Sequence, residues 1–140
     1  MQPQKVVYFG SDGQIRPELL DGEAREVARA LAGKVNKTQL RRYYHDVMNL
    51  QRRLSLMAEQ LRGSDRRQQA FARLRADFMM LKAKAHYANG RSRTTFPDEL
   101  LQFFVNHTHA VKTVDDFDAF CRHFQAVVAF HEYFGKEEKR

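Results

Sequence analysis

The sequence predicts an all-α protein, a compact bundle of about five helices. Over two long stretches, apolar residues recur at alternating spacings of three and four, which is the period of an amphipathic helix. Only three prolines occur, and Gly33, Gly63, Gly90 and Gly135 each follow a helical pattern, as glycines at helix ends do. With 43% hydrophobic residues and eleven Phe, the 140-residue chain can bury one core without a disulfide or a metal.

The first three helices follow from their apolar stripes. The first is expected from about residue 17 or 21 to residue 32, and the second from about residue 36 to residue 61. The third runs from Ser64, as its N-cap, to Asn89. The seam of the second helix consists of Leu40, Tyr43, Val47, Leu50, Leu54, Met57 and Leu61, and that of the third of Phe71, Leu74, Phe78, Leu81 and Ala85. These long helices predict an antiparallel hairpin, whose seam could close within the chain or between two chains.

The fourth and fifth helices complete the bundle. Pro97 opens the fourth helix, since proline is favoured near the first helical position, and this helix is expected to end near residues 109–112. Residues 113–116, with the sequence TVDD, predict a capping arrangement for the fifth helix, which is expected to end at Phe134. Most of the Phe residues fall in these two helices, so we expect them to supply the bulk of the core.

This pattern places a single helical bundle domain at residues 17–135. Residues 1–16 are expected to be flexible or to form a short strand at residues 6–9, and residues 136–140 to form a charged tail. We see no signal peptide and no apolar run of about 18 residues, so we expect no membrane segment. Cys121 is the single cysteine, which excludes an intramolecular disulfide and fits a cytoplasmic protein.

Positive charge is concentrated in the middle of the chain. Residues 34–93 contain 15 of the 24 Lys and Arg but only four acids, a net charge of +11, whereas residues 1–33 have −1 and residues 94–140 have −3. Eleven of these 15 cations are Arg, whose planar guanidinium can donate two parallel hydrogen bonds to one phosphate. A basic excess confined to one segment predicts contact with a polyanion there.

The second helix presents its cations on one face. Arg41, His45 and Arg52 lie at i, i+4 and i+11, opposite the apolar seam, and Arg53 lies beside them. On the third helix, Lys82 belongs to a second basic face, which continues towards the end of that helix. The alternative for either face is an ordinary solvated surface, although solvated faces usually mix charges of both signs.

The sequence contains no pattern typical of a metal site or an active site. His107 and His109 are two residues apart, whereas two ligands on one helix face need a spacing of three or four. No glycine-rich phosphate loop and no Ser- or Cys-centred motif occurs, so we predict neither enzymatic activity nor a cofactor. Tyr43 and Tyr44 could stack on bases, although Tyr43 fits the apolar seam.

Three stretches resemble blocks of one small all-helical family. Residues 34–44 read KVNKTQLRRYY, close to an opening block with the pattern K-V-T-T-S-Q-I-R. Residues 81–91 read LKAKAHYANGR and resemble a second block, L-K-P-K-L-A-Y-A-x-x-R. Residues 124–135 read FQAVVAFHEYFG and resemble the C-terminal block, F-E-A-V-V-A-Y-H-K-x-x-G. The family is the small subunit of type III-A CRISPR effector complexes, the Csm type; its blocks occur here in order, with departures such as Ala83 for Pro.

The resemblance implies a non-catalytic subunit of an antiviral ribonucleoprotein. Several copies would stack along the guide RNA and its target RNA, beside the backbone and large subunits, and would grip RNA backbone without reading its sequence. The expected RNA contacts are Lys34, Lys37, Arg41, Arg42 and Arg91 from the family blocks, and His45, Arg52, Arg53 and Lys82 from the charged faces.

Two other functions stay open. The basic face could meet an acidic protein partner, which would make the chain a helical interaction adaptor with Met48, Met79 or Met80 as further contacts. A small DNA-binding regulator is the third hypothesis, but such proteins use short helices at a steep angle rather than two long helices in a hairpin. A protein partner that is retained after RNase treatment would favour the adaptor. Preferential binding of a specific DNA duplex over single-stranded RNA would favour the regulator.

Overall fold

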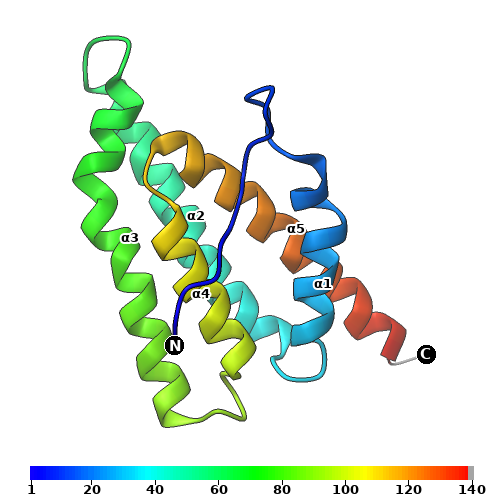
Figure 1. Ribbon diagram of the computed structural model, residues 1–140. Coiled ribbons are helices and arrows are strands. Elements are labelled where there is room, and N and C mark those ends of the chain that lie inside the picture. Colours follow the sequence, from blue (N-terminus) through cyan, green and yellow to red (C-terminus); the bar gives the residue numbers. More distant parts are fainter. Residues whose placement is uncertain (139–140) are drawn as a thin grey trace.

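The computed structural model describes residues 1–138 and confirms the all-α prediction (Figure 1). In this part of the chain, five α-helices follow a short 3-10 helix, η1. Their bounds are Pro17–Leu20 for η1, Gly22–Leu31 for α1, Lys37–Glu59 for α2, Arg66–Arg91 for α3, Asp98–Ala110 for α4 and Val114–Glu138 for α5. None of these helices combines the length and the apolar composition that crossing a membrane requires.

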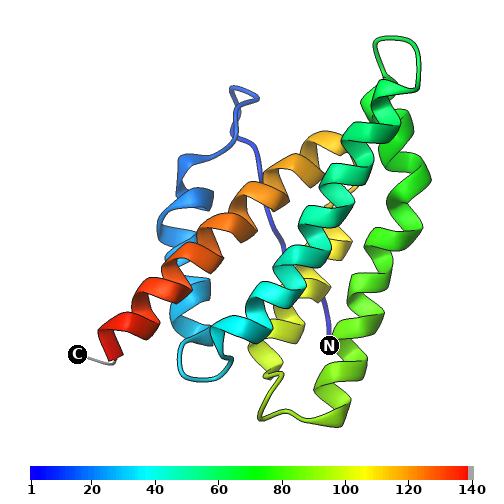
Figure 2. The ribbon, with the colours of Figure 1, turned by 180° about the vertical axis from the view of Figure 1, so that it is seen from behind.

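Helices α2 and α3 form the predicted antiparallel hairpin, and its seam closes within this one chain. Val47 and Leu54 of α2 are buried, as are Phe71 and Phe78 of α3. Figures 1 and 2 show the two helices side by side, with their connecting loop projecting beyond the rest of the bundle. Gly63 in that loop has a φ of +99°, a conformation that side chains with a Cβ rarely adopt.

The start of α5 is capped as predicted, but the start of α3 is not. The Asp116 N–H donates to the Thr113 hydroxyl at 3.2 Å, and the Asp116 carboxylate accepts from the Thr113 N–H at 3.2 Å. The expectation that Ser64 caps α3 is wrong, because Asp65 holds the N-cap position. The Asp65 carboxylate accepts a 2.7 Å hydrogen bond from the side chain of Gln69, not from a backbone N–H.

Helices α3 and α5 are longer than predicted because a glycine lies inside each of them. The sequence predicts helix ends before Gly90 and Gly135, but the helices continue to Arg91 and Glu138. A glycine inside a helix costs only about 1 kcal/mol relative to Ala, which the packing of a long helix offsets. The predicted charged tail at residues 136–140 is therefore helical as far as residue 138, and residues 139 and 140 lie outside the described residues.

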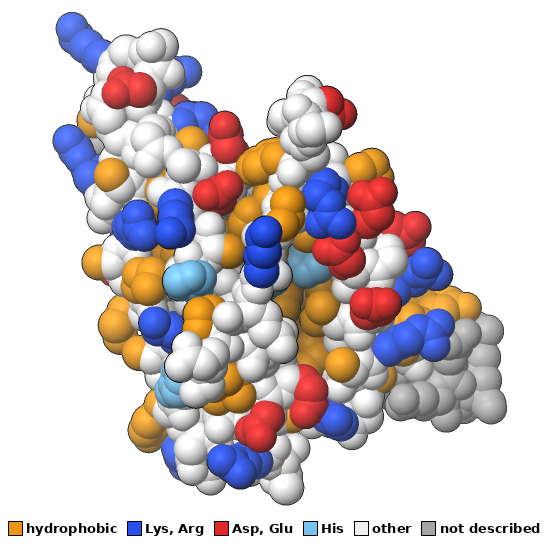
Figure 3. Space-filling view, viewed as in Figure 1, with side chains coloured by type: hydrophobic (Ala, Val, Ile, Leu, Met, Phe, Trp, Pro, Cys, Tyr) orange, Lys and Arg blue, Asp and Glu red, His pale blue; other side chains and the backbone are white. Residues whose placement is uncertain are grey.

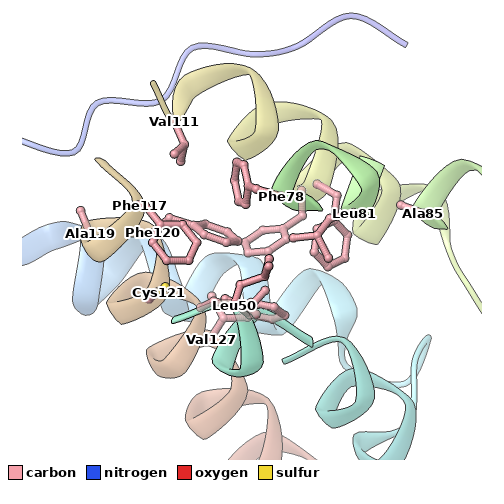
Figure 4. Close-up of a cluster of buried hydrophobic side chains, with 14 of the residues drawn as sticks. Leu50, Phe78, Leu81, Ala85, Val111, Phe117, Ala119, Phe120, Cys121 and Val127 are labelled. Carbon is pink, nitrogen blue, oxygen red and sulfur yellow. The ribbon is translucent and has the colours of Figure 1, made fainter. Parts of the chain in front are cut away.

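Phenylalanines from α3, α4 and α5 form the centre of the core. The last two helices supply most of these rings but less than half of the buried hydrophobic residues in the described chain, so the expectation that they supply the bulk of the core is met only for the aromatic centre. Phe78 and Phe117 meet edge to face with ring centroids 5.5 Å apart, and Phe120 lies 5.8 Å from Phe78 (Figure 4). Phe104 of α4 packs edge to face on Phe124 of α5 at 5.8 Å. Helix α5 packs against both α1 and α2, so it connects the hairpin with the N-terminal helices.

Residues 1–9 cross α4 in an extended conformation, and a tight turn at residues 10–14 then leads the chain back towards η1 (Figure 1). The short strand expected at residues 6–9 does not form; a single antiparallel bridge joins Phe9 and Ile15 instead. The Tyr8 side chain is buried, and its hydroxyl shares a 2.7 Å hydrogen bond with Nδ1 of His107 on α4. This contact attaches the segment to the bundle.

Candidate nucleic-acid interface

The outward face of α2 contains six of the nine predicted RNA contacts. They are Lys37, Arg41, Arg42, His45, Arg52 and Arg53, and all six are exposed. The helix starts after Asn36, whose Oδ1 accepts a 2.8 Å hydrogen bond from the N–H of Gln39. Figure 2 shows α2 in front, between α5 and α3. The apolar seam fixes which side of α2 is buried, and so leaves these cations facing solvent.

Glu132 of α5 pairs with the first cations of this face. Its carboxylate lies 2.7 Å from Nη2 of Arg41 and 3.7 Å from Nζ of Lys37. The hydrogen bond from the Arg41 guanidinium lowers the pKa of Glu132. Arg41 and Lys37 therefore already have a negatively charged partner in the free chain, and any phosphate that binds there would have to compete with it.

Two further predicted contacts are also paired. Nζ of Lys34 lies 2.7 Å from Glu99 of α4, and Nη2 of Arg53 lies 2.8 Å from Asp77 of α3. Arg52 instead donates a 3.0 Å hydrogen bond to an uncharged asparagine one turn earlier on α2. Exposed ion pairs contribute little to stability, so a phosphate can replace these carboxylates without endangering the fold.

Lys82 does not share the α2 face. It follows Asp77 by five residues on α3, so its side chain lies about 140° around that helix from the carboxylate that pairs with Arg53. Arg75 and His86 share its side of α3, at spacings of seven and four. Figure 3 shows Lys, Arg and His side chains along the visible side of this helix. The structure therefore separates Lys82 from the other eight predicted contacts.

Arg42 and Arg91 meet across a groove between α2 and α3. The groove has a volume of about 740 Å³, and Lys84 and Tyr87 also line it. Within the described part of the chain, Arg42, Lys84 and Arg91 form no ion pair. Neither Lys84 nor Tyr87 is among the predicted contacts. Their spacing of seven and four from Arg91 was a signal, because it places them on one side of α3 away from its apolar seam. The sequence does not show that Arg42 of α2 lies across from that side.

Tyr43 and Tyr44 pack towards the core. Tyr43 meets Phe96 edge to face with ring centroids 5.1 Å apart, and Tyr44 meets Phe124 at 5.5 Å. Burial raises the pKa of both phenols. The expectation that Tyr43 packs with the core is confirmed. Both rings are half-buried, and one side of Tyr43 also lines the α2–α3 groove.

Three buried histidines form hydrogen bonds within the fold. His123 Nδ1 donates to the Leu19 carbonyl at 2.6 Å, and His131 Nε2 donates to the Val35 carbonyl at 2.9 Å. The rings of His107 and His123 have centroids 5.1 Å apart. Burial lowers the pKa of His123 and holds that of His107 well below its usual range. Among the described residues, no three His, Cys, Asp or Glu side chains gather as a metal site.

A second hollow separates α1 from α4 beneath the N-terminal segment (Figure 3). Val27 and Phe103 contribute apolar surface to its lining. The lining also contains four acids and two cations, which are Glu23, Glu26, Asp98, Glu99, Lys5 and Arg16. The acids outnumber the cations and repel phosphate, so this hollow suits RNA less well than the basic surface of α2. The candidate nucleic-acid interface is therefore the outward face of α2 together with the α2–α3 groove.

The fold and this surface define a class of small all-helical proteins that present a basic face from one long helix. Residues 14–137 match the family model described as Csm2 Type III-A, and the chain belongs to this family. It is a small subunit of the type III-A CRISPR effector complex. The match includes residues 14–33, which precede the first recognisable block of the sequence. No curated protein and no solved structure matches the chain.

Proposed function

We propose that this subunit is non-catalytic and binds the backbone of guide RNA and target RNA through the outward face of α2. In the assembled complex it lies beside copies of itself and beside the backbone and large subunits, and it acts in antiviral defence in the cytoplasm. Family membership supports its assembly with other subunits. The distribution of charge supports its contact with RNA.

The row of exposed cations on α2 is the observation that carries this proposal. Arg42 and Arg52 have no carboxylate partner among the described residues, and Arg41 and Arg53 have partners that a phosphate can replace. Such side chains on a helix face recognise phosphate rather than base edges, so the binding is independent of sequence. For single strands, log K falls with log salt by about 0.7 for each phosphate neutralised.

Charge reversal tests the face directly. Arg41→Glu combined with Arg52→Glu should sharply weaken RNA binding by the assembled complex and should flatten its salt dependence. Lys112→Glu combined with Arg122→Glu is the matched control, because it changes the net charge equally at exposed positions outside residues 34–93. Unchanged RNA binding in the first variant, or equal loss in both, would rule out the α2 face as the RNA contact.

A protein-interaction adaptor is the second candidate, and exposed apolar side chains on the same face favour it. Met48 is 38% exposed and Leu56 is 54% exposed, and both lie on α2 among the cations. An acidic protein partner with a few apolar side chains would match such a surface. Pull-down of tagged protein with and without RNase separates the two functions. A partner that survives complete RNA removal supports the adaptor, and loss of all partners supports RNA binding.

A further inference from the structure

Four side chains of α3 form a stripe along the α2–α3 groove. Met80, Lys84, Tyr87 and Arg91 follow at spacings of four, three and four, so they lie on one side of the helix, and all four line the groove. Tyr87 is 67% exposed and Met80 is 52% exposed. The stripe therefore presents a flexible thioether at one end and an aromatic ring between the two cations Lys84 and Arg91.

Tyr87 differs from the tyrosines of α2. Tyr43 and Tyr44 are half-buried against phenylalanines of the core, and Tyr43 forms part of the groove wall. The Tyr87 ring is exposed instead and lies next to the guanidinium of Arg91, with Cζ 5.8 Å from the ring centroid. Exposed aromatic rings next to arginine are the features on which proteins stack the bases of single-stranded nucleic acid.

The lining of the groove is basic as well as aromatic. Arg42, Lys84 and Arg91 contribute three cations, and Asp46 is the one acid among its described lining residues. The volume of about 740 Å³ lies within the range of roughly 300–1,000 Å³ that ligand pockets span, so a nucleotide fits. A nucleotide uses both features of the groove, because it carries a flat base and a phosphate. An acidic peptide carries the charge without the flat base.

We infer that this groove is a subsite for one unstacked nucleotide of single-stranded RNA. The base stacks on Tyr87, and Arg42, Lys84 and Arg91 bind the adjacent phosphates. The subsite rests on the proposed RNA-backbone function and extends it, because the outward face of α2 supplies phosphate contacts alone. Every base has a flat face, so the stacking adds affinity without sequence preference.

The chain contains no Trp, which permits a direct test by fluorescence. Tyr87→Trp places a single indole in the groove, and Tyr133→Trp, at a position that is 55% exposed on α5, is the matched control. Oligouridylate is titrated into each full-length variant at low salt, and inorganic polyphosphate serves as the anion without bases. We expect oligouridylate to quench the indole of the Tyr87→Trp variant. Polyphosphate should leave this emission unchanged, and neither ligand should alter that of the control.

Affinity measurements separate stacking from charge. Tyr87→Ala should weaken oligouridylate binding by about tenfold, and Tyr87→Phe should retain it, because a phenyl ring keeps the stacking face. Polyphosphate should bind all three forms equally. The exposure of Tyr87 makes a folding defect unexpected, and thermal unfolding of each variant checks this.

Equal quenching at both tryptophan positions would overturn the inference. It would also be overturned if Tyr87→Ala weakened polyphosphate binding as much as oligouridylate binding, or weakened neither. A different result would contradict the proposed function itself. In that case Arg41→Glu combined with Arg52→Glu would leave the binding of both oligouridylate and polyphosphate unchanged. If Tyr87→Ala impaired capture of a protein partner but not of RNA, the groove would belong to the adaptor function.

Discussion

Removing the negative charge of Glu132 is expected to strengthen RNA binding. This carboxylate lies 2.7 Å from Arg41 and 3.7 Å from Lys37, so it occupies two cations of the proposed RNA face. Glu132→Gln keeps the size of the side chain and frees both cations for phosphate. The variant should therefore bind RNA more tightly, because the Glu132 carboxylate no longer competes with phosphate for Arg41 and Lys37.

The salt dependence gives the magnitude of this effect. Arg42, Arg52, Lys84 and Arg91 have no carboxylate partner among the described residues. If each of these four neutralises one phosphate of a single strand, log K falls with log salt with a slope of about −3. Two freed cations steepen this slope by about 1.4. The gain in affinity is about two- to fivefold at low salt, because an exposed carboxylate is a weak competitor.

The assay is the fluorescence anisotropy of a labelled single-stranded RNA, titrated with full-length protein at several salt concentrations. Glu26→Gln is the matched control, because it removes the same charge at an exposed position on α1. If both variants changed the slope and the affinity equally, the gain would come from total charge. The reasoning about local competition at Arg41 would then be refuted.

Three further predictions concern the stability of the fold, measured by urea unfolding. Burial lowers the pKa of His107 and His123, so the unfolded chain binds more protons below about pH 6.5. The free energy of unfolding should therefore fall from about pH 7 to pH 5, by up to about 1.4 kcal/mol per pH unit for each histidine. His109→Asn, at an exposed position, should keep this dependence, and a flat profile of the wild type would contradict the burial. Phe78→Ala should cost about 3–5 kcal/mol, since the ring is fully buried, and a loss below about 1 kcal/mol would show that it lies outside the core. Thr113→Ala should cost about 1 kcal/mol through loss of the helix cap, and no loss would mean that the cap does not stabilise α5.

The hairpin could be predicted because its information is local. Residues from Leu40 to Leu61 repeat at helical spacing, and burial of that stripe fixes the orientation of the whole helix. The ends of α3 and α5 could not be predicted in the same way. Gly90 and Gly135 resemble end signals, but the packing of the rest of each helix outweighs their small helical penalty.

The basic face could be predicted only in part. Clustered cations at helical spacing located the outward side of α2, but their partners come from distant parts of the chain. Glu132 follows Arg41 by 91 residues, and Glu99 follows Lys34 by 65 residues, so only the folded chain brings these groups together. Tyr87 lies inside a recognised sequence block, yet its significance depends on the groove that it shares with Arg42 of α2, which only the folded chain forms.

Some cations of the proposed RNA-binding surface are ion-paired and others are not, so phosphate binding costs more free energy at some positions than at others. At Arg42 and Arg91 a phosphate would have no carboxylate to displace, whereas at Arg41 it would have to displace that of Glu132. RNA is therefore expected to bind first at the α2–α3 groove and to extend from there along α2 towards α5. An affinity for RNA inferred from the net charge of +11 in residues 34–93 would consequently be too high for the free chain. The number of cations without a carboxylate partner is the better measure, because only those bind phosphate without first breaking an ion pair.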